Sequence, residues 1–304
     1  MFNIYSGRRR AVFGIAGAAL LSLTLAACGE QEDGGGDAPG AGPTVSAGAD
    51  SALAAKVPDA IKADGKIVVG TDSSYAPAEF LDPDGKTVIG FDVELFTAVA
   101  AKLGLRAEFV SANFGEIIEG VNSGKYEVGV SSFTINDERK AQTNMVSYYQ
   151  VGTQWVTKKG NPAGVAIDNA CGKKIAVQRD TVQVEDITAR SKACTDAGKP
   201  AIVIEQFPGQ DAATAAVVSG KDDAMLADYP VGAYAVTQAG GQLELLDKMY
   251  DAAPYGYVIA KDQTAFAEAV RDATKALIAD GAYRTVLDKW QVGDGAITDP
   301  AINP

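Results

Sequence analysis

Residues 90–104 read GFDVELFTAVAAKLG, and this stretch decides the fold class of the chain. Apolar side chains recur in it at every fourth position, at Phe91, Leu95, Val99 and Leu103. That spacing predicts a helix with one apolar face, and Gly104 lies where a glycine commonly ends a helix. A strand-like run, RAEFV at 106–110, follows directly. The stretch therefore predicts a helix that leads into a buried strand.

The same alternation of strand-like and helical stretches continues on both sides of residues 90–104. The other strand-like runs are KIVVG (66–70), EVGVSSF (127–133), KKIAVQ (173–178), AIVIEQF (201–207) and DDAMLAD (222–228). Helical patterns separate them, which is typical of α/β proteins with mostly parallel sheets. We expect two such series, each with its own core.

The first residues predict an export signal. Arg8, Arg9 and Arg10 precede an apolar stretch from Ala11 to Ala27, which is too short to favour a membrane-spanning helix. Leu25 to Cys28 resembles the bacterial lipobox, so residues 1–27 are expected to be a lipoprotein signal peptide. Cys28 would then carry diacylglycerol and a further acyl chain such as palmitate. The two adjacent arginines before Ala11 leave twin-arginine and general export equally open.

The segment after Cys28 is rich in glycine and acidic residues, and we expect 28–63 to hold the lipidated cysteine and a flexible tether. The formal charge of the whole chain is −12, and removal of residues 1–27, with three arginines and no acid, leaves −15. A nucleic-acid partner is therefore not expected, because phosphate binding requires a basic surface.

Two further cysteines, Cys171 and Cys194, are expected to form a disulfide, because disulfides persist in exported proteins. The chain contains no histidine, and two thiolates do not complete a tetrahedral zinc site. The absence of histidine also excludes Ser-His-Asp triads and imidazole acid-base catalysis. No metal, cofactor or enzymatic activity is expected.

Ligands of open α/β sheets bind beyond the carboxyl ends of the strands. The residues at those ends include Asp72, Tyr75, Phe114, Thr134, Arg139, Gln178, Arg179, Thr181 and Asp228. Singly, each has a structural explanation as a cap, a turn former or a solvated side chain. Together they offer a guanidinium for a carboxylate, an acid for an ammonium and aromatic rings for a side chain. An α-amino acid carries these groups.

The chain resembles the family 3 extracellular solute-binding proteins, the amino-acid receptors of ABC importers. GFDVELFTAVAAKLG is similar to the signature helix of that family, and GTDSSYAPAEF, FGEIIEGVNSGKYEVGVSSFTINDERK and GAYRTVLDKW recur in the same order. The resemblance implies a two-lobed, type II periplasmic-binding-protein fold, each lobe a mostly parallel sheet flanked by helices, with two hinge strands. Lobe one would comprise 64–151 and 256–291, lobe two 154–253, and 292–304 would be a C-terminal tail.

The resemblance also implies roles for individual residues. Asp72 would support the ligand side chain, and Tyr75 and Phe114 would pack on it. Ser132 would offer its carbonyl to the ligand amine, Thr134 its hydroxyl, and Arg139 would clamp the α-carboxylate. Thr181 and Val182 would close on that carboxylate, Asp228 would bind the α-ammonium, and Gln178 lies where related receptors often have lysine.

The implied function is a lipid-anchored, monomeric receptor on the outer face of the bacterial membrane, which delivers a polar amino acid to an ABC permease. Glutamine or glutamate is favoured; Arg179, as a candidate partner for an acidic side chain, would favour glutamate. The alternative is an enzyme on the same fold, such as a cyclohexadienyl or arogenate dehydratase. Whether Arg179 contacts the ligand or points to solvent stays open at this stage.

Overall fold

The computed structural model describes residues 47–304. The predicted signal peptide and lipidated Cys28 lie outside these residues. Within them, no helix is both long and apolar enough to cross a membrane. The same region contains no group of three or more Cys, Asp or Glu side chains placed to hold a metal ion.

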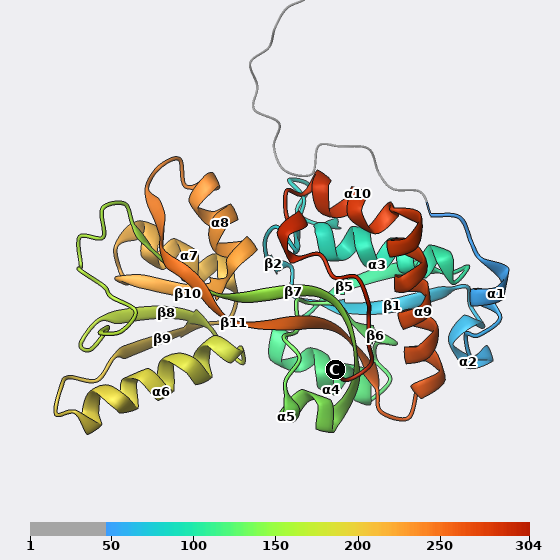
Figure 1. The fold of residues 1–304 in the computed structure, drawn as a ribbon, viewed down its shortest axis with the longest axis horizontal. Coiled ribbons are helices and arrows are strands. Elements are labelled where there is room, and N and C mark those ends of the chain that lie inside the picture. The colour runs from blue at the N-terminus through green and yellow to red at the C-terminus, as the bar shows by residue number, and fades with distance from the viewer. Residues whose placement is uncertain (1–46) are drawn as a thin grey trace, which may run out of the picture. The chain divides into compact units, whose positions relative to one another are not determined.

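One eight-stranded sheet runs through the described part of the chain, with strand order β5-β1-β6-β11-β7-β10-β8-β9. Two long strands in its middle, β7 (Thr143–Lys158) and β11 (Leu243–Ala260), pair antiparallel over most of their length. The shorter strands are β1 (Lys66–Thr71), β5 (Arg106–Ser111), β6 (Val128–Gly129), β8 (Lys174–Gln178), β9 (Val203–Phe207) and β10 (Ala224–Asp228). We call the side with β5, β1 and β6 the first lobe, and the side with β10, β8 and β9 the second lobe (Figure 1).

Within each lobe the short strands are parallel: β1 pairs with β5 and β6, and β8 pairs with β9 and β10. The predicted two-lobed α/β fold is therefore confirmed. The register of β7 against β11 shifts between Leu246 and Tyr250, between Tyr250 and Ala253, and between Tyr255 and Gly256. These irregularities lie where the paired strands pass from one lobe to the other.

Helices cover both faces of the sheet in each lobe (Figure 1). In the first lobe α3 (Phe91–Lys102), α9 (Thr264–Asp280) and α10 (Ala282–Lys289) share one core, and α4 (Phe114–Asn122) packs over another. In the second lobe α6 (Val182–Asp196) covers one face, whereas α7 (Gln210–Ser219) and α8 (Tyr229–Gln238) cover the other. The short helix α5 (Asp137–Gln142) leads into β7.

The helix predicted from residues 90–104 is α3, and Gly90 explains how it begins. Gly90 has a φ of +141°, and a Cβ there would lie 2.0 Å from the carbonyl oxygen of Ala78. This close approach lets Phe91 and Asp92 donate their backbone N–H groups to the carbonyls of Pro77 and Ala78. The glycine thus fixes α3 against the loop between the first two strands of a small sheet, whose strands are β2 (Ser74–Tyr75), β3 (Glu79–Leu81) and β4 (Val88–Ile89).

The two ends of the domain contain more regular structure than the sequence analysis expected. Part of the predicted tether 28–63 forms helices α1 (Ser51–Ala54) and α2 (Asp59–Lys62), because Leu53 and Val57 are buried in the first-lobe core. The predicted tail 292–304 includes a 3₁₀ turn, η1 (Gly293–Gly295), and then lies along β7. There the backbone N–H of Ser147 donates to Ala301, which holds the segment against the first lobe.

The predicted disulfide is present. It joins Cys171, in the loop before β8, to Cys194 in α6, and both cysteines belong to one hydrophobic cluster of the second lobe. The bridge closes a loop with a sequence separation of 23 residues. Chain-entropy arguments give such a cross-link a stabilisation of about 3 kcal/mol.

Candidate functional site

A narrow cavity lies between the two lobes, and all ten residues proposed from the sequence to contact a ligand line it. They are Asp72, Tyr75, Phe114, Ser132, Thr134 and Arg139 from the first lobe, and Gln178, Thr181, Val182 and Asp228 from the second. Ser131 and Gln183 complete the lining. The strand-end rule explains the grouping: most of these residues follow β1, β6, β8 and β10, whose carboxyl ends face the same interlobe region.

Arg139 is the cationic residue of the cavity lining. It lies in α5, whose N-cap Asn136 accepts a hydrogen bond from the Arg139 backbone N–H at 2.9 Å. The guanidinium lies over the rings of Phe114 and Phe133, at 5.3 and 5.4 Å from their centroids. Its Nη1 donates to the carbonyl oxygen of Thr134 at 2.8 Å, and its Nη2 to that of Asp180 at 3.2 Å.

Those contacts leave part of the guanidinium available for a ligand. An arginine has five N–H donors in a fixed fork, and a planar carboxylate can accept two parallel hydrogen bonds from it. Burial lowers the pKa of Arg139, and the negative charge of Asp228 opposes that effect. The geometry suits a bound carboxylate.

Asp228 ends β10 and accepts hydrogen bonds from both lobes. Its Oδ2 accepts from the hydroxyls of Tyr75 at 2.9 Å and Tyr255 at 2.6 Å, and its Oδ1 accepts from Gln183 Nε2 at 2.8 Å. Burial raises the pKa of this carboxyl, while Tyr255, Tyr75 and Gln183 act in the opposite direction. A carboxylate offers about four lone-pair positions, so one stays available for an ammonium donor.

Asp72 is a second buried acid of the cavity, and it also joins the lobes. Its Oδ2 accepts from Gln178 Nε2 at 2.8 Å and from the backbone N–H of Phe114 at 3.1 Å, and Oδ1 accepts from Ser74 at 3.1 Å. Burial raises the pKa of Asp72, and the bonds from Ser74 and Phe114 lower it. Asp72 and Gln178 thus form a polar pair that could hold hydrogen-bond donors of a ligand side chain.

Behind Ser131 and Ser132 lies a pair of fully buried acids, Glu79 and Asp92, which the sequence analysis did not single out. The Ser131 hydroxyl is 3.3 Å from Glu79 Oε1, and Asp92 Oδ2 accepts from the backbone N–H of Ser132 at 3.1 Å. Tyr148 donates its hydroxyl to the same Asp92 oxygen. The acids hold Ser132 in a left-handed conformation, with a φ of +50°, which is rare for residues other than glycine.

This acid pair makes stability depend on pH. Burial, and then the charge of Asp92, raise the pKa of Glu79, and burial raises the pKa of Asp92 to about 6. Both carboxyls titrate near pH ~4 in an unfolded chain. The folded protein therefore keeps a proton that the unfolded chain has lost, so this contribution to stability is present below pH ~4 and is lost as the pH rises through the folded pKa.

Glu79→Gln should therefore make the free energy of unfolding less dependent on pH. The neutral amide needs no shared proton, so we expect the variant to gain about 1 kcal/mol over the wild type between pH 4.5 and pH 7.5. Urea denaturation at both pH values measures this. Glu268→Gln, at an exposed position of α9, is the control. Equal pH dependence in Glu79→Gln and the wild type would contradict the expectation.

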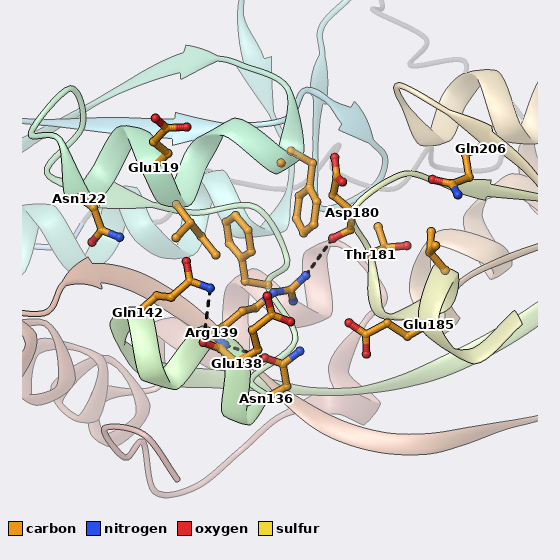
Figure 2. A pocket seen from close by; sticks show the side chains of 15 residues that line it. Glu119, Asn122, Asn136, Glu138, Arg139, Gln142, Asp180, Thr181, Glu185 and Gln206 are labelled. Atoms are coloured by element: carbon orange, nitrogen blue, oxygen red, sulfur yellow. Dashed lines mark hydrogen bonds between the residues drawn. The ribbon is translucent and has the colours of Figure 1, made fainter. Parts of the chain in front are cut away.

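A wider pocket adjoins the cavity and shares Phe114, Arg139 and Thr181 with it (Figure 2). Its rim carries the carboxylates of Glu119, Glu138, Asp180 and Glu185. Arg179 lines neither space, and its side chain is exposed. The interpretation of Arg179 as a partner for an acidic ligand therefore has no support in the structure.

Two residues that bind Asp228 do not directly follow a strand and were not predicted from the sequence. Tyr255, which lies in β11, donates to Asp228, and so does Gln183, the second residue of α6. Thr181 was expected to direct its hydroxyl at a ligand carboxylate, but it donates to the Gln178 carbonyl at 2.8 Å. In that position the Thr181 hydroxyl oxygen can still accept a hydrogen bond. Thr181 is also the N-cap residue of α6.

Comparison with known proteins places this cavity in context. The family profile of the bacterial extracellular solute-binding proteins, family 3, matches residues 67–293, which span the sheet and the cavity lining. The chain belongs to this family. Family 3 proteins with similar sequences include the arginine-binding protein ArgT of Corynebacterium glutamicum, which is 32% identical over 298 residues, 97% of this chain and 96% of that protein.

Other family 3 relatives carry names with different ligands. The L-cystine-binding protein TcyJ of Escherichia coli is 26% identical over 252 residues (82% of this chain and 90% of that protein). The glutamine-binding protein GlnH of Bacillus subtilis is 25% identical over 241 residues (78% and 85%). The names of these relatives describe binding proteins for amino acids, and they differ in the amino acid.

Solved structures agree with the fold. An ancestral arginine-binding protein bound to arginine superposes with a TM-score of 0.69 at 30% identity, covering 74% of this chain and 98% of that one. An ancestral amino acid-binding protein described as a precursor of cyclohexadienyl dehydratase superposes with a TM-score of 0.66 at 31% identity, covering 79% and 99%. The second structure is thus itself a binding protein, and its description relates it to a dehydratase only as a precursor.

Proposed function

We propose that this protein binds a cationic α-amino acid, arginine or lysine, between its lobes and delivers it to an ABC permease. The observation that carries the proposal is the charge of the cavity lining: two carboxylates, Asp72 and Asp228, face one guanidinium, Arg139. The α-carboxylate of a bound amino acid would pair with Arg139, and its α-ammonium would pair with Asp228. The charge of Asp72 would then have no partner in the head group of the ligand, and a cationic side chain would neutralise it.

The aromatic residues of the cavity support this assignment. Phe114 already carries the Arg139 guanidinium over its ring, and Tyr75 lies beside Asp228. Flat cations stack favourably on aromatic faces, and the aliphatic stem of arginine or lysine packs on them as well. The arginine-binding names of ArgT and of the ancestral protein agree with the proposal.

Glutamine is the second candidate, because the Asp72–Gln178 pair offers both an acceptor and an amide to a neutral side-chain amide. Glutamate, favoured equally from the sequence, is not proposed further. Its side chain would place a further carboxylate beside Asp72 with no additional cation in the lining.

Other parts of the proposal rest on the sequence and the family. The protein would be exported and anchored through a lipid on Cys28, and it would act as a monomer that closes around its ligand. The ten cavity residues named from the sequence would form the ligand site, and the chain would pass between lobes near Gly152 and Pro254. Because the ligand would contact both lobes, it would bind the closed form better and shift the equilibrium toward it.

Asp72→Asn tests the ligand class. We expect calorimetry of the wild type against the twenty amino acids, ornithine and citrulline to show tightest binding of arginine or lysine. Loss of one charge-assisted contact should weaken that binding by about 10- to 100-fold in Asp72→Asn, and change citrulline and glutamine binding by less than about threefold. Equal losses for arginine and citrulline would point to glutamine-type recognition, and a wild type that binds no amino acid would refute the receptor assignment.

A further inference from the structure

Gly115 and Asp180 lie in contact in the lining of the wider pocket, and the sequence analysis assigned no role to either. Gly115 is the second residue of α4 in the first lobe, and Asp180 follows β8 in the second. A Cβ built on Gly115 would lie 2.3 Å from Oδ2 of Asp180, 2.8 Å from its Cγ and 3.2 Å from its Cβ. The Asp180 side chain therefore occupies the space that any other residue at position 115 would fill.

The same aspartate holds the arginine of the cavity. Its backbone carbonyl accepts from Arg139 Nη2 at 3.2 Å, a contact drawn as a dashed line in Figure 2. The other end of the fork is held by Thr134, within the first lobe. The Arg139 guanidinium is thus positioned by one carbonyl from each lobe.

The backbone of Asp180 is suited to this reach. Its φ is +63°, in the left-handed region that turns the chain sharply between β8 and α6. Gly115, by contrast, has an ordinary helical position, and its φ does not require glycine. The lack of a side chain at position 115 is therefore explained by the neighbouring lobe and not by the conformation of α4.

We propose that Gly115 and Asp180 form a latch that lets the lobes close and so positions Arg139 on the ligand. The inference rests on the proposed function, since it concerns closure around a bound amino acid. Both are positioning residues: Gly115 lines the outer pocket only, and Asp180 acts through its contact with Arg139.

Gly115→Ala separates this role from a merely structural one, because the substitution should leave the stability of the ligand-free protein unchanged or higher but weaken ligand binding. Alanine favours a helix more than glycine does, so the ligand-free variant should unfold at the same or a higher temperature. In the closed form, however, the new methyl group meets Asp180. We expect the dissociation constant to rise by about five- to tenfold, mainly through faster dissociation.

Asp180→Gly provides the rescue. It removes the atoms that the alanine meets, keeps the carbonyl that Arg139 binds, and suits the left-handed backbone. In the Asp180→Gly background, adding Gly115→Ala should change the affinity by less than about twofold. Since the same substitution costs about five- to tenfold in the wild type, the effects of the two substitutions are not additive, and the two sites are coupled. Gly48→Ala, where a Cβ meets nothing within 4 Å, is the matched control.

Small-angle scattering of the ligand-free full chain measures closure without any ligand. Gly115→Ala should have a larger radius of gyration than the wild type, and the double variant should not differ from Asp180→Gly. An unchanged affinity and radius in Gly115→Ala, or an equal loss in both backgrounds, overturns the latch. If the wild type binds no amino acid, the proposed function fails alone, and the scattering comparison still decides on the latch.

Discussion

Arg139→Ala should abolish amino-acid binding while leaving the protein folded. The side chain provides the cation of the cavity lining, and truncating one partner of a buried, hydrogen-bonded charge pair costs about 2–5 kcal/mol. We therefore expect a loss of at least about 100-fold in affinity, whichever amino acid is bound. Calorimetry measures the loss, and thermal unfolding of the ligand-free chain checks the fold.

Two further variants make that result specific. Arg139→Lys keeps the charge but loses the two-pronged geometry, so it should recover only part of the affinity. Arg179→Ala removes an exposed arginine that lines neither pocket, and it should bind like the wild type. Normal binding by Arg139→Ala, or a comparable loss in Arg179→Ala, would show that the carboxylate is held elsewhere.

Asp228→Asn is expected to have the second-largest effect. The substitution keeps the size of the side chain but removes the charge that would pair with the α-ammonium, and it replaces one acceptor of the tyrosine hydroxyls by a donor. We expect at least about 100-fold weaker binding of every amino acid, in contrast to the ligand-selective loss in Asp72→Asn. The panel of ligands distinguishes the two acids.

The control for Asp228→Asn lies at the other end of the same segment. Asp222 precedes β10, is also buried, and neither of its carboxylate oxygens has a partner among the described residues. Asp222→Asn removes an equally buried charge far from the cavity lining, so binding should be unchanged. If both variants lost affinity equally, the effect of Asp228 would reflect the second lobe as a whole and not the ammonium contact.

Binding through Asp228 also has a pH dependence of known sign. Burial raises the pKa of this carboxyl above its usual range, so protons compete with the ligand ammonium as the pH falls. The wild-type affinity should decline toward acid pH. The residual binding of Asp228→Asn should lack that part of the decline.

The residues of the cavity that could be predicted from the sequence are the polar side chains at or soon after the ends of strands. Asp72 directly follows β1, Asp228 ends β10, and Arg139 lies in the short helix after β6; each was found because the apolar run of its strand is easy to detect. Tyr255 and Glu79 were not found, since they reach the site through pairing of β11 and packing of β3, and those contacts join segments distant in sequence. The ordered N- and C-terminal segments were missed for the same reason: their small apolar residues are buried only by partners elsewhere in the chain.

The ligand preference, too, could not be predicted from neighbouring residues in the sequence, because it depends on contacts between distant segments. Arg179 was considered because it neighbours Gln178 in sequence, but successive residues of an extended segment point to opposite sides. Gln178 is buried against Asp72, and Arg179 is exposed. The net charge of the cavity lining follows only from the folded structure, in which the lobes bring Asp72, Arg139 and Asp228 together.

The order of the elements along the chain has a consequence for synthesis. The core of the first lobe combines α3 with Phe266, Val270 and Leu287 from α9 and α10, near the end of the chain. The second lobe, in contrast, is built from one continuous stretch between β7 and β11. Chains emerge from the ribosome at about 5–20 residues per second, so the lobe that starts first is completed last. The core of the first lobe cannot be complete until α9 and α10 have been made, whereas all strands of the second lobe are present once β11 has been made.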